Sequence, residues 1–535
     1  MARSRSCGSR TCRSEPFHCL RASARWYHQR VILLLIACKP TPEVPPDSGS
    51  QDTTDTADTA DTSNVPDEPP LAHADVVIIG GGASGLSAGL VATAAGASVL
   101  ILERESVLGG SGTYAGNFFA AGTTWQDEEG IEDSPEQALE EWADFTNGGD
   151  PTHPWVQNFV YSSAENLDWL GDYGGSFAGL TDDLGGGSTP RIHTLQPTNK
   201  GHPVQVMANL MNEDAWPNTT GVGLIISGGA VIGVSIEDAD GTTGWVEGGA
   251  VIVATGGFAR NDSRVYAVLP ELKALPRHTG AWHSADGNGL DLIESVGGAL
   301  ENMENIALYG HSTTDANLGS PEIQLVINVE GGMVVGSSGM RVMNEDNLRG
   351  VWGGRAALTH GQLLGIYDSD RWDLLQMTGF GYNYMPITDG QTTASEYATL
   401  MDIAHADTLQ ELGQQLSIDG DVLLQSVMDY NAAVEGGEDT AFGRDVSQVS
   451  TLRIAPFYAL PLAAATGKSF GGAALAEDGG VLGVDGEVIP GLFAAGEVAG
   501  ALGGDHIGQG ISGSIAAIIY TGRIAGASAA AYAME

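Results

Sequence analysis

Three glycines at the spacing G-x-G-x-x-G are the first residues in this 535-residue chain whose pattern could support chemistry. Gly80, Gly82 and Gly85 lie between an apolar run and a stretch of small residues, which predicts a strand, a tight turn and a helix. In such a unit the first glycine permits the turn, the second admits a pyrophosphate, and the third lets the helix pack on the strand. Glu103 follows near the spacing expected for a carboxylate that binds a ribose hydroxyl. These residues predict a dinucleotide site.

The elements that must position this site form a βαβ unit. We expect a strand over residues 75–79, a helix over 83–95 and a second, parallel strand over 98–102. The phosphates would then lie at the amino end of the helix, where free N–H groups and the helix dipole favour anions. The alternative is a glycine-rich turn without a ligand, in a chain that has 76 glycines. Because strand, glycines, helix, strand and acid occur in order, we favour dinucleotide binding.

Four motifs in a fixed order carry a resemblance to a known family. They are the segment 80–103 with a second glycine turn at 109–112, an A-x-G-G-F-A segment at 254–259, a G-x-R-x-x-N-E segment at 339–345, and a strand-to-helix segment at 493–514. With these motifs the chain resembles the fumarate reductase and succinate dehydrogenase flavoproteins of the FAD-binding-2 type, which include ketosteroid dehydrogenases. The resemblance covers roughly residues 74–532 and implies that the dinucleotide is FAD.

The resemblance implies an α/β fold, a Rossmann-like FAD-binding domain with an inserted α+β capping domain. The expected organisation is a signal peptide with a lipobox (1–38), a disordered acidic Pro/Thr/Asp linker (39–73), the first part of the FAD-binding domain (74–259), the capping or substrate domain (260–454) and the C-terminal part of the FAD-binding domain (455–535). Within these domains we expect one helix over 155–173, a surface loop at 191–193 and a cap helix over 422–434.

Each motif supplies residues that the resemblance implies for FAD. The acid of the last strand, Glu497, would hold the ribityl chain, and N–H groups at the start of the last helix would stabilise negative charge on the reduced flavin. Because no histidine occurs in residues 109–116, where succinate dehydrogenases tether the flavin, the FAD is expected to be noncovalent. The implied set is Gly80, Gly82, Ala83, Ser84, Gly85, Glu103, Arg104, Gly109, Gly110, Ser111, Gly112, Ala254, Thr255, Gly256, Gly257, Gly496, Glu497, Gly510, Ile511 and Ser512.

The chain departs from fumarate reductases at three basic positions. The resemblance aligns the proton-donating arginine of those enzymes with Asn328, a histidine with Lys468, and the substrate-clamping arginine with His506. An asparagine cannot donate a proton at neutral pH, and the loss of one fixed cation removes several kcal/mol of dicarboxylate recognition. We therefore do not expect fumarate to be the substrate.

Five polar residues remain as candidates for catalysis near the flavin. Lys468, His506, Asp505, His283 and Tyr458 could bind or protonate a carbonyl or a single carboxylate. His506 stands beside Asp505, which could orient its tautomer for proton transfer. Tyr458 matches a tyrosine that ketosteroid dehydrogenases use, and its alternative interpretation is a core aromatic. For His283 a loop histidine without a catalytic role is the alternative.

The favoured function is that of an exported FAD-dependent oxidoreductase acting on CH–CH bonds. It would transfer a hydride between flavin N5 and a carbon–carbon bond next to a carbonyl or carboxylate, in either direction. A ketosteroid-like or cyclic ketone dehydrogenase is one alternative, and a catalytically decayed flavin-binding surface protein is another. Outside the cytoplasm, electrons would be exchanged with a quinone or a cytochrome, since the chain itself has no C-x-x-C-H haem motif.

Composition narrows the partners and sites further. The 67 acidic and 23 basic residues give a formal charge of −44, which disfavours nucleic acid and anionic lipid as partners. All four cysteines precede residue 39, so thiolate metal sites, disulfides and cysteine nucleophiles are excluded from the folded part, and no metal site is predicted.

The first 73 residues read as an export and anchoring segment. The apolar run 31–37 follows several arginines and is too short to span a bilayer, as in a signal peptide. The segment 35–38 looks like a bacterial lipobox in which Cys38 is lipidated, and the polar tract that follows would be an extended tether. We thus expect a small-molecule substrate, a membrane association through Cys38 alone, and a location at the bacterial cell envelope or in the periplasm.

Overall fold

The computed structural model describes ten segments of the chain. They are residues 63–146, 149–181, 189–275, 277–279, 283–312, 332–345, 352–378, 403–447, 449–500 and 514–535. The contacts place all of them in one compact unit, Ala60–Glu535. Among the helices of these segments, none combines the length and the apolar character of a membrane span.

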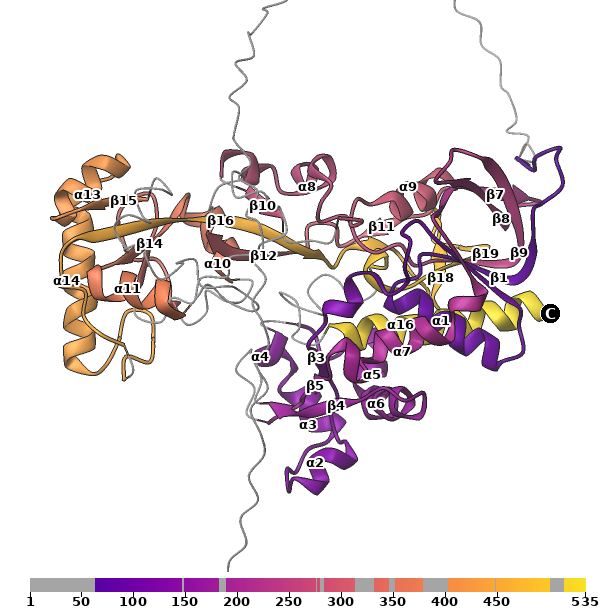
Figure 1. The fold of residues 1–535 in the computed structure, drawn as a ribbon, viewed down its shortest axis with the longest axis horizontal. Coiled ribbons are helices and arrows are strands. Elements are labelled where there is room, and N and C mark those ends of the chain that lie inside the picture. The colour runs from indigo at the N-terminus through magenta and orange to yellow at the C-terminus, as the bar shows by residue number, and fades with distance from the viewer. Residues whose placement is uncertain are drawn as a thin grey trace, which may run out of the picture. The chain divides into compact units, whose positions relative to one another are not determined.

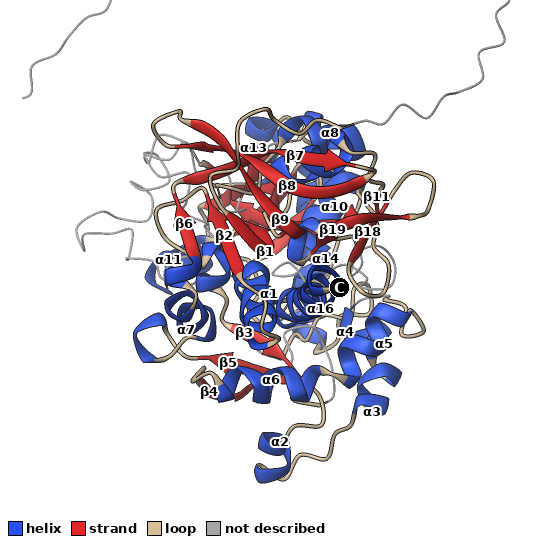
Figure 2. Cartoon of the chain, turned by 90° about the vertical axis from the view of Figure 1, so that its right-hand side faces the viewer, coloured by secondary structure: helices blue, strands red, loops and turns tan. Residues whose placement is uncertain are grey.

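Within the described residues, eight strands form a mixed sheet that we call the central sheet (Figures 1 and 2). The strand order is β18-β19-β9-β1-β2-β6, with β8 paired to β9 and β7 to β8. The five strands from β19 to β6 are parallel, so their carboxyl ends meet at one edge. The bounds are β1 His73–Ile79, β2 Val99–Glu103, β6 Ala215–Pro217, β7 Thr219–Ser227, β8 Ala230–Asp238, β9 Thr243–Val253, β18 Gly480–Leu482 and β19 Val488–Ala494.

Two helices rich in small residues pack against this sheet, α1 (Ala83–Ala94) and α16 (Ile515–Met534). They approach each other closely because α16 carries glycines where it meets α1. A Cβ atom at Gly522 would lie 2.1 Å from Ser87 Oγ, and one at Gly526 would lie 2.3 Å from the carbonyl oxygen of Ala88. The predicted β1, α1 and β2 are confirmed, and so is the α/β fold.

A three-stranded antiparallel sheet, β3-β5-β4, packs below α16 together with several short helices. Its aromatic core reaches α16, because Phe159 lies 5.6 Å from Phe119 and 5.7 Å from Tyr520 between ring centroids. The bounds are β3 Asn117–Phe119, β4 Phe177–Thr181, β5 Ile192–Leu195, α2 Thr124–Glu128, α3 Pro135–Glu140, α4 Trp142–Thr146, α5 Pro154–Tyr161, α6 Ser163–Asp172 and α7 Pro203–Leu210.

Two local predictions are wrong in this region. Residues 191–193 are not a surface loop, because His193 lies in the middle strand β5 and Arg191 is buried with ion pairs to Asp133 (2.8 Å) and Glu141 (2.7 Å). The single helix expected over 155–173 is two helices, α5 and α6. They divide at Ser162, whose hydroxyl donates to a backbone carbonyl of the preceding turn.

The second large sheet, which we call the cap sheet, is built around the 13-residue strand β16 (Phe457–Ser469). Strand β16 pairs with β14 and β15 over its first half and with β10 and β12 over its second half. The predicted cap helix is confirmed as α14, which begins after the N-cap Asp419. The bounds are β10 Arg277–Thr279, β12 Ile306–Ser312, β13 Met333–Val335, β14 Leu363–Tyr367, β15 Ala404–Ala406, α10 Trp352–His360, α11 Ser369–Thr378, α13 Leu409–Leu416 and α14 Gly420–Gly436.

Buried charges hold the 339–345 motif within the cap. Arg341 pairs with Glu345 (2.6 Å) and Asp439 (2.8 Å), and Arg444 pairs with the same Glu345 (3.2 Å). The motif therefore has a structural role in the cap. The remaining elements are α8 Asp262–Val268, α9 Asn288–Ser295, β11 Leu300–Glu301, β17 Gly472–Ala473 and the 3₁₀ turns η1 Gly110–Tyr114, η2 Thr198–Lys200, η3 Asn212–Asp214, η4 Pro270–Ala274 and η7 Gly496–Val498.

Candidate FAD and substrate site

The glycine turns of three motifs meet at the carboxyl ends of β1, β2 and β9. Gly82 forms a parallel bridge with Gly109, whose N–H donates to the carbonyl of Gly81 at 2.8 Å. Gly80 has φ +106°, and a Cβ there would lie 2.5 Å from the carbonyl oxygen of Ala254. A Cβ at Gly85 would lie 2.0 Å from the Gly80 oxygen, so the helix packs on the turn as the motif predicts.

The last motif reaches the same place through η7. A Cβ at Gly496 would lie 2.4 Å from Ser84 Oγ, and a Cβ at Gly112 would lie 2.9 Å from Ala83. The structure therefore brings together the described residues that the resemblance implies for FAD. They are Gly80, Gly82, Ala83, Ser84, Gly85, Glu103, Gly109, Gly110, Gly112, Ala254, Thr255, Gly257, Gly496 and Glu497, and Arg104, Ser111 and Gly256 adjoin these residues along the chain.

The cradle at these turns fits a dinucleotide. A Cβ at Gly82 or Gly256 would meet no atom within 4 Å, so open space adjoins the backbone at both turns. The hydroxyl of Thr255 is buried without a hydrogen-bond partner among the described residues, and it faces α9, because a Cβ at Gly289 would lie 2.0 Å from it. Open space beside glycine amides is what a pyrophosphate needs.

The end of β2 is fixed by its own acid. Glu103 accepts hydrogen bonds from the N–H groups of Gly81 (2.7 Å) and Glu105 (2.8 Å). Burial raises the pKa of the Glu103 carboxyl, although both hydrogen bonds and the charge of Arg104 act against burial. The Glu103 carboxylate therefore fixes the turn at Gly81. The contact that we expect between Glu103 and a ribose hydroxyl would lie next to this turn.

Arg104 and His283 lie together next to this end of β2. Arg104 donates to Asp286 and to the carbonyl of Ser284, both at 2.6 Å. The His283 Nε2 atom lies 2.8 Å from Glu105 Oε1, and 43% of the His283 side chain is exposed. This environment fits the loop-histidine interpretation, and His283 does not line the pocket described next.

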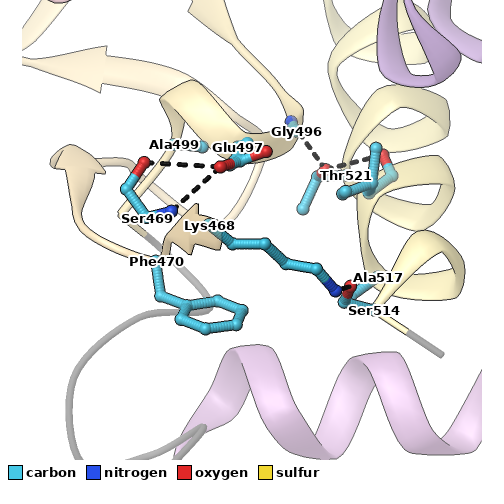
Figure 3. Close-up of a pocket in the computed structure, with 10 residues that line it drawn as sticks. Lys468, Ser469, Phe470, Gly496, Glu497, Ala499, Ser514, Ala517 and Thr521 are labelled. Carbon is cyan, nitrogen blue, oxygen red and sulfur yellow. Dashed lines mark hydrogen bonds between the residues drawn. The ribbon is translucent and has the colours of Figure 1, made fainter. Parts of the chain in front are cut away.

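A pocket between β16, η7 and α16 forms the other part of the site (Figure 3). Polar groups at its walls come from elements that are distant in the sequence, whereas Phe470 and Ile518 supply apolar surface. Its lining residues are Lys468, Ser469, Phe470, Gly496, Glu497, Ala499, Ser514, Ala517, Ile518 and Thr521. We call this the Lys468 pocket.

Glu497 is the acid of the Lys468 pocket. One carboxylate oxygen accepts the N–H of Ser469 at 2.9 Å, and a Cβ at Gly257 would lie 2.6 Å from the same oxygen. Burial raises the pKa of the Glu497 carboxyl, and the Ser469 hydrogen bonds together with the charge of Lys468 oppose this shift. A carboxyl in this place, beside the glycine turns, fits the role of a group that receives ribityl hydroxyls.

The Lys468 side chain extends across the Lys468 pocket. The Lys468 side chain leaves the end of β16 and reaches α16, where its ammonium donates to Ser514 Oγ at 2.6 Å (Figure 3). Sequence reasoning singled out Lys468 but gave Ser514 no role. Its only signal was its place in the segment 493–514, directly before the last helix.

Tyr458 does not lie with Lys468. Tyr458 is 2% exposed, and its ring stacks with Trp372 (4.9 Å between centroids, 9° between planes) and with His405 (5.7 Å, 21°). Ten residues of β16 separate it from Lys468, which at about 3.3 Å per residue is roughly 33 Å. The core-aromatic interpretation describes this environment.

Several predicted site residues lie outside the described part of the chain. They are Asn328, Asp505, His506, Gly510, Ile511 and Ser512. Their roles stay predictions. Among the described residues there is also no group of three or more His, Cys, Asp or Glu side chains that could hold a metal ion.

Known proteins resemble this chain over most of its length. Residues 75–512 match the family described as FAD binding domain. A fumarate reductase (cytochrome) of Shewanella frigidimarina is 33% identical over 481 residues, covering 86% of this chain and 78% of that protein. A urocanate reductase of Eggerthella lenta is 28% identical and covers 86% and 75%. The solved structure of a 3-ketosteroid-Δ4-(5α)-dehydrogenase from Rhodococcus jostii RHA1 matches with a TM-score of 0.67 and 26% identity, covering 88% and 99%.

Proposed function

Because the chain belongs to the FAD binding domain family and is an FAD-dependent oxidoreductase of the CH–CH type, we propose that it transfers a hydride between flavin N5 and a carbon–carbon bond next to a carbonyl or carboxylate. FAD supplies the hydride chemistry. The residues of the chain bind FAD, hold the substrate and exclude water. The observation that carries the proposal is Lys468, which lines the same pocket as Glu497 and Gly496 of the FAD cradle.

Lys468 can serve either substrate group. An ammonium pairs with a carboxylate, and it can also donate to a carbonyl oxygen and draw electron density from the adjacent double bond. Phe470 and Ile518 line the same pocket and would cover the apolar part of a substrate. These features support a small unsaturated acid or ketone as the substrate class.

Glu497 and the glycine turns would hold FAD, and we propose that they do so without a covalent bond. The open space at Gly82 and Gly256 supports the binding, and the absence of a histidine in residues 109–116 supports the noncovalent attachment. The test is to denature the purified yellow protein with acid and to separate protein from flavin. Noncovalent FAD leaves with the small molecules, whereas flavin that stays on the polypeptide would refute the proposal.

Fumarate is not the proposed substrate, although a relative is named for it. The proposal rests on the aligned positions Asn328, Lys468 and His506, which leave fewer fixed cations than two carboxylates need. Among the described residues that line the Lys468 pocket, Lys468 is the one basic side chain. Urocanate carries one carboxylate and fumarate carries two. A comparison of the two as electron acceptors therefore tests how many carboxylates the site binds.

The experiment follows the reoxidation of the dye-reduced protein at the flavin absorption band. Unsaturated monocarboxylates and enones are each added, with fumarate as the comparison. We expect an unsaturated monocarboxylate or enone to reoxidise the flavin at least ten times faster than fumarate does. Equal or faster reoxidation by fumarate would overturn the substrate class, and no reoxidation by any of them would overturn the proposed reaction.

A ketosteroid-like or cyclic ketone dehydrogenase is the second candidate. The structural similarity to the Rhodococcus jostii enzyme favours this candidate. Tyr458 does not support it, because this residue lies far from Lys468 along β16. A saturated cyclic ketone that bleaches the oxidised protein without a dye would favour this candidate.

The location and redox partner are also proposals. A lipid anchor on Cys38 would place the protein at the cell envelope, where a quinone or a cytochrome would exchange its electrons. Mass spectrometry of the mature protein tests the anchor, because a diacylglyceryl group on Cys38 is expected and a protein that keeps residues 1–37 would contradict it. Flavin reoxidation by a quinone analogue or a small cytochrome, measured under anaerobic conditions, tests the partner.

A further inference from the structure

Ser514 is a serine at the start of a helix whose hydroxyl does not cap that helix. It is 7% exposed, has φ −51° and ψ −19°, and its side chain makes no capping hydrogen bond to α16. Serine at this position ordinarily accepts an N–H of the first turn, a bond worth about 1 kcal/mol to the helix. The Ser514 hydroxyl instead contacts the ammonium of Lys468 at 2.6 Å.

The position of Ser514 is fixed by the fold. Its backbone forms an antiparallel bridge with Phe118 of β3, and it begins a 20-residue helix that packs along α1. Lysine, in contrast, has a flexible four-carbon stem and about 2 kcal/mol of rotamer entropy. The hydrogen bond between Lys468 and Ser514 therefore fixes the position of the ammonium, whereas the position of Ser514 does not depend on this bond.

A second group in the pocket would attract a released ammonium. The Glu497 carboxyl is buried, and the charge of Lys468 already lowers its pKa against the effect of burial. Within the described residues no ion pair joins these two side chains, and Ser514 is the hydrogen-bond partner of the ammonium. A direct Lys468–Glu497 pair would consume both the cation for the substrate and the acid for FAD.

We infer that Ser514 is a positioning residue, which holds the Lys468 ammonium on the α16 side of the pocket so that its two other N–H groups can bind the carboxylate of an unsaturated monocarboxylic acid. The inference rests on the proposed function, and it narrows the substrate class to acids with one carboxylate. Two N–H donors on one nitrogen match one carboxylate group, and the apolar walls of the pocket match the remainder of such a molecule.

The composition of the chain permits a direct test of the positioning. The chain has only four lysines, Lys39, Lys200, Lys273 and Lys468, so the rate at which an amine-selective reagent modifies each one can be resolved by mass spectrometry. The FAD-loaded wild type is compared with Ser514→Ala and Ser514→Thr. The matched control is Ser528→Ala, the same change in the same helix, outside the pocket.

In Ser514→Ala we expect modification of Lys468 to fall about tenfold, because the released ammonium pairs with Glu497 and an ion-paired ammonium reacts more slowly with the reagent. Lys200 and Lys273 should keep their wild-type rates, and Ser514→Thr should restore the wild-type rate at Lys468. An unchanged rate at Lys468 in Ser514→Ala would overturn the inference. Because the hydroxyl does not cap α16, the variant should fold. Should it not, Ser514→Cys, which keeps the size and weakens the hydrogen bond, replaces it with the same expectation.

Kinetics with an unsaturated monocarboxylate then test the substrate role. Ser514→Ala should raise KM about tenfold with a smaller change in kcat, Ser514→Thr should restore KM, and Ser528→Ala should match the wild type. A KM unchanged by Ser514→Ala would overturn the substrate role. A wild type that reduces enones but no unsaturated acid would overturn the narrowing to acids and leave the proposed function in place, whereas a wild type that reduces neither would refute the proposed function. In both cases the labelling rates would still decide whether Ser514 positions Lys468.

Discussion

His193 makes stability depend on pH below neutrality. It lies in the middle strand β5 with no exposed surface, its Nε2 atom is 3.1 Å from Thr123 Oγ1, and the Trp125 ring packs edge-on at 6.0 Å. Burial lowers the pKa of this imidazole from 6.5 to about 4, and hydrogen bonds to backbone groups together with the charge of Asp133 only partly oppose it. The folded protein therefore holds His193 neutral where an unfolded chain would protonate it.

The sign and size follow from these two pKa values. Above pH 6.5 the imidazole is neutral in both states and contributes nothing to the pH dependence. Between pH 6.5 and 4 the unfolded state binds a proton that the folded state does not, so the free energy of unfolding falls by up to about 1.4 kcal/mol per pH unit. At pH 5 the loss from His193 is about 2 kcal/mol, and at pH 4 it approaches about 3 kcal/mol.

Urea unfolding followed by tryptophan fluorescence at pH 7.5, 6 and 5 measures this loss, with Trp125 as a nearby reporter. His193→Gln cannot titrate, so its stability should fall by about 2 kcal/mol less than the wild type between pH 7.5 and 5. The control Thr123→Val removes the hydrogen-bond partner of His193 and the N-cap of α2. It should lower stability by about 1 to 2 kcal/mol at every pH and keep the wild-type slope. Equal slopes for His193→Gln and the wild type would refute the reasoning.

Three further predictions concern the FAD cradle and the buried charges. Gly82→Ala should fold, because the new Cβ meets no protein atom, but it should bind FAD at least tenfold more weakly in a fluorescence titration. Gly85→Ala should yield unstable protein, because its Cβ would lie 2.0 Å from a carbonyl oxygen. Equal FAD affinity of Gly82→Ala and the wild type would contradict the proposed cradle. Asp133→Ala leaves the buried Arg191 with one carboxylate fewer, and it should lower the free energy of unfolding by about 3 to 5 kcal/mol, measured by thermal unfolding. A loss under about 1 kcal/mol would contradict this prediction. Glu497→Ala should weaken FAD binding about tenfold or more while Glu497→Gln retains most of it, and two variants with identical affinities would remove the ribityl role from Glu497.

The FAD cradle was predictable because its residues act through local geometry. A turn needs glycine at Gly80 whatever the rest of the fold does, and the helix after it needs Gly85 to approach the strand. Glu103 was predictable from spacing along the second strand. In each case the sequence distance is short, so the pattern determines the contact.

The candidate catalytic residues were harder to place because their contacts span long sequence distances. Tyr458 and Lys468 are ten residues apart in the sequence. Because β16 is an extended strand, this spacing places them near its opposite ends, which the sequence alone does not indicate. His283 pairs with Glu105, 178 positions away, which no local pattern indicates. The sequence predicts a polar loop for Arg191 and His193, yet both are buried against partners fifty or more residues away. Tertiary context outweighs local polarity at such positions.

The end of β16 explains how one short segment can serve both parts of the proposed site. Successive side chains of a strand point to opposite faces, so Lys468 reaches Ser514 on α16, while the hydroxyl of Ser469 accepts the N–H of Phe258 and lies beside Glu497. The pairing of Lys468 with Ala307 on β12 fixes this register. A slip of one residue would exchange the two faces and turn the ammonium toward the FAD-binding acid. The register of β16 against β12 shifts between Thr466 and Lys468, so the faces of Lys468 and Ser469 are set locally by their pairs with Ala307 and Ile306. The separation of cation and acid in the pocket is therefore a property of the strand register at this end of β16.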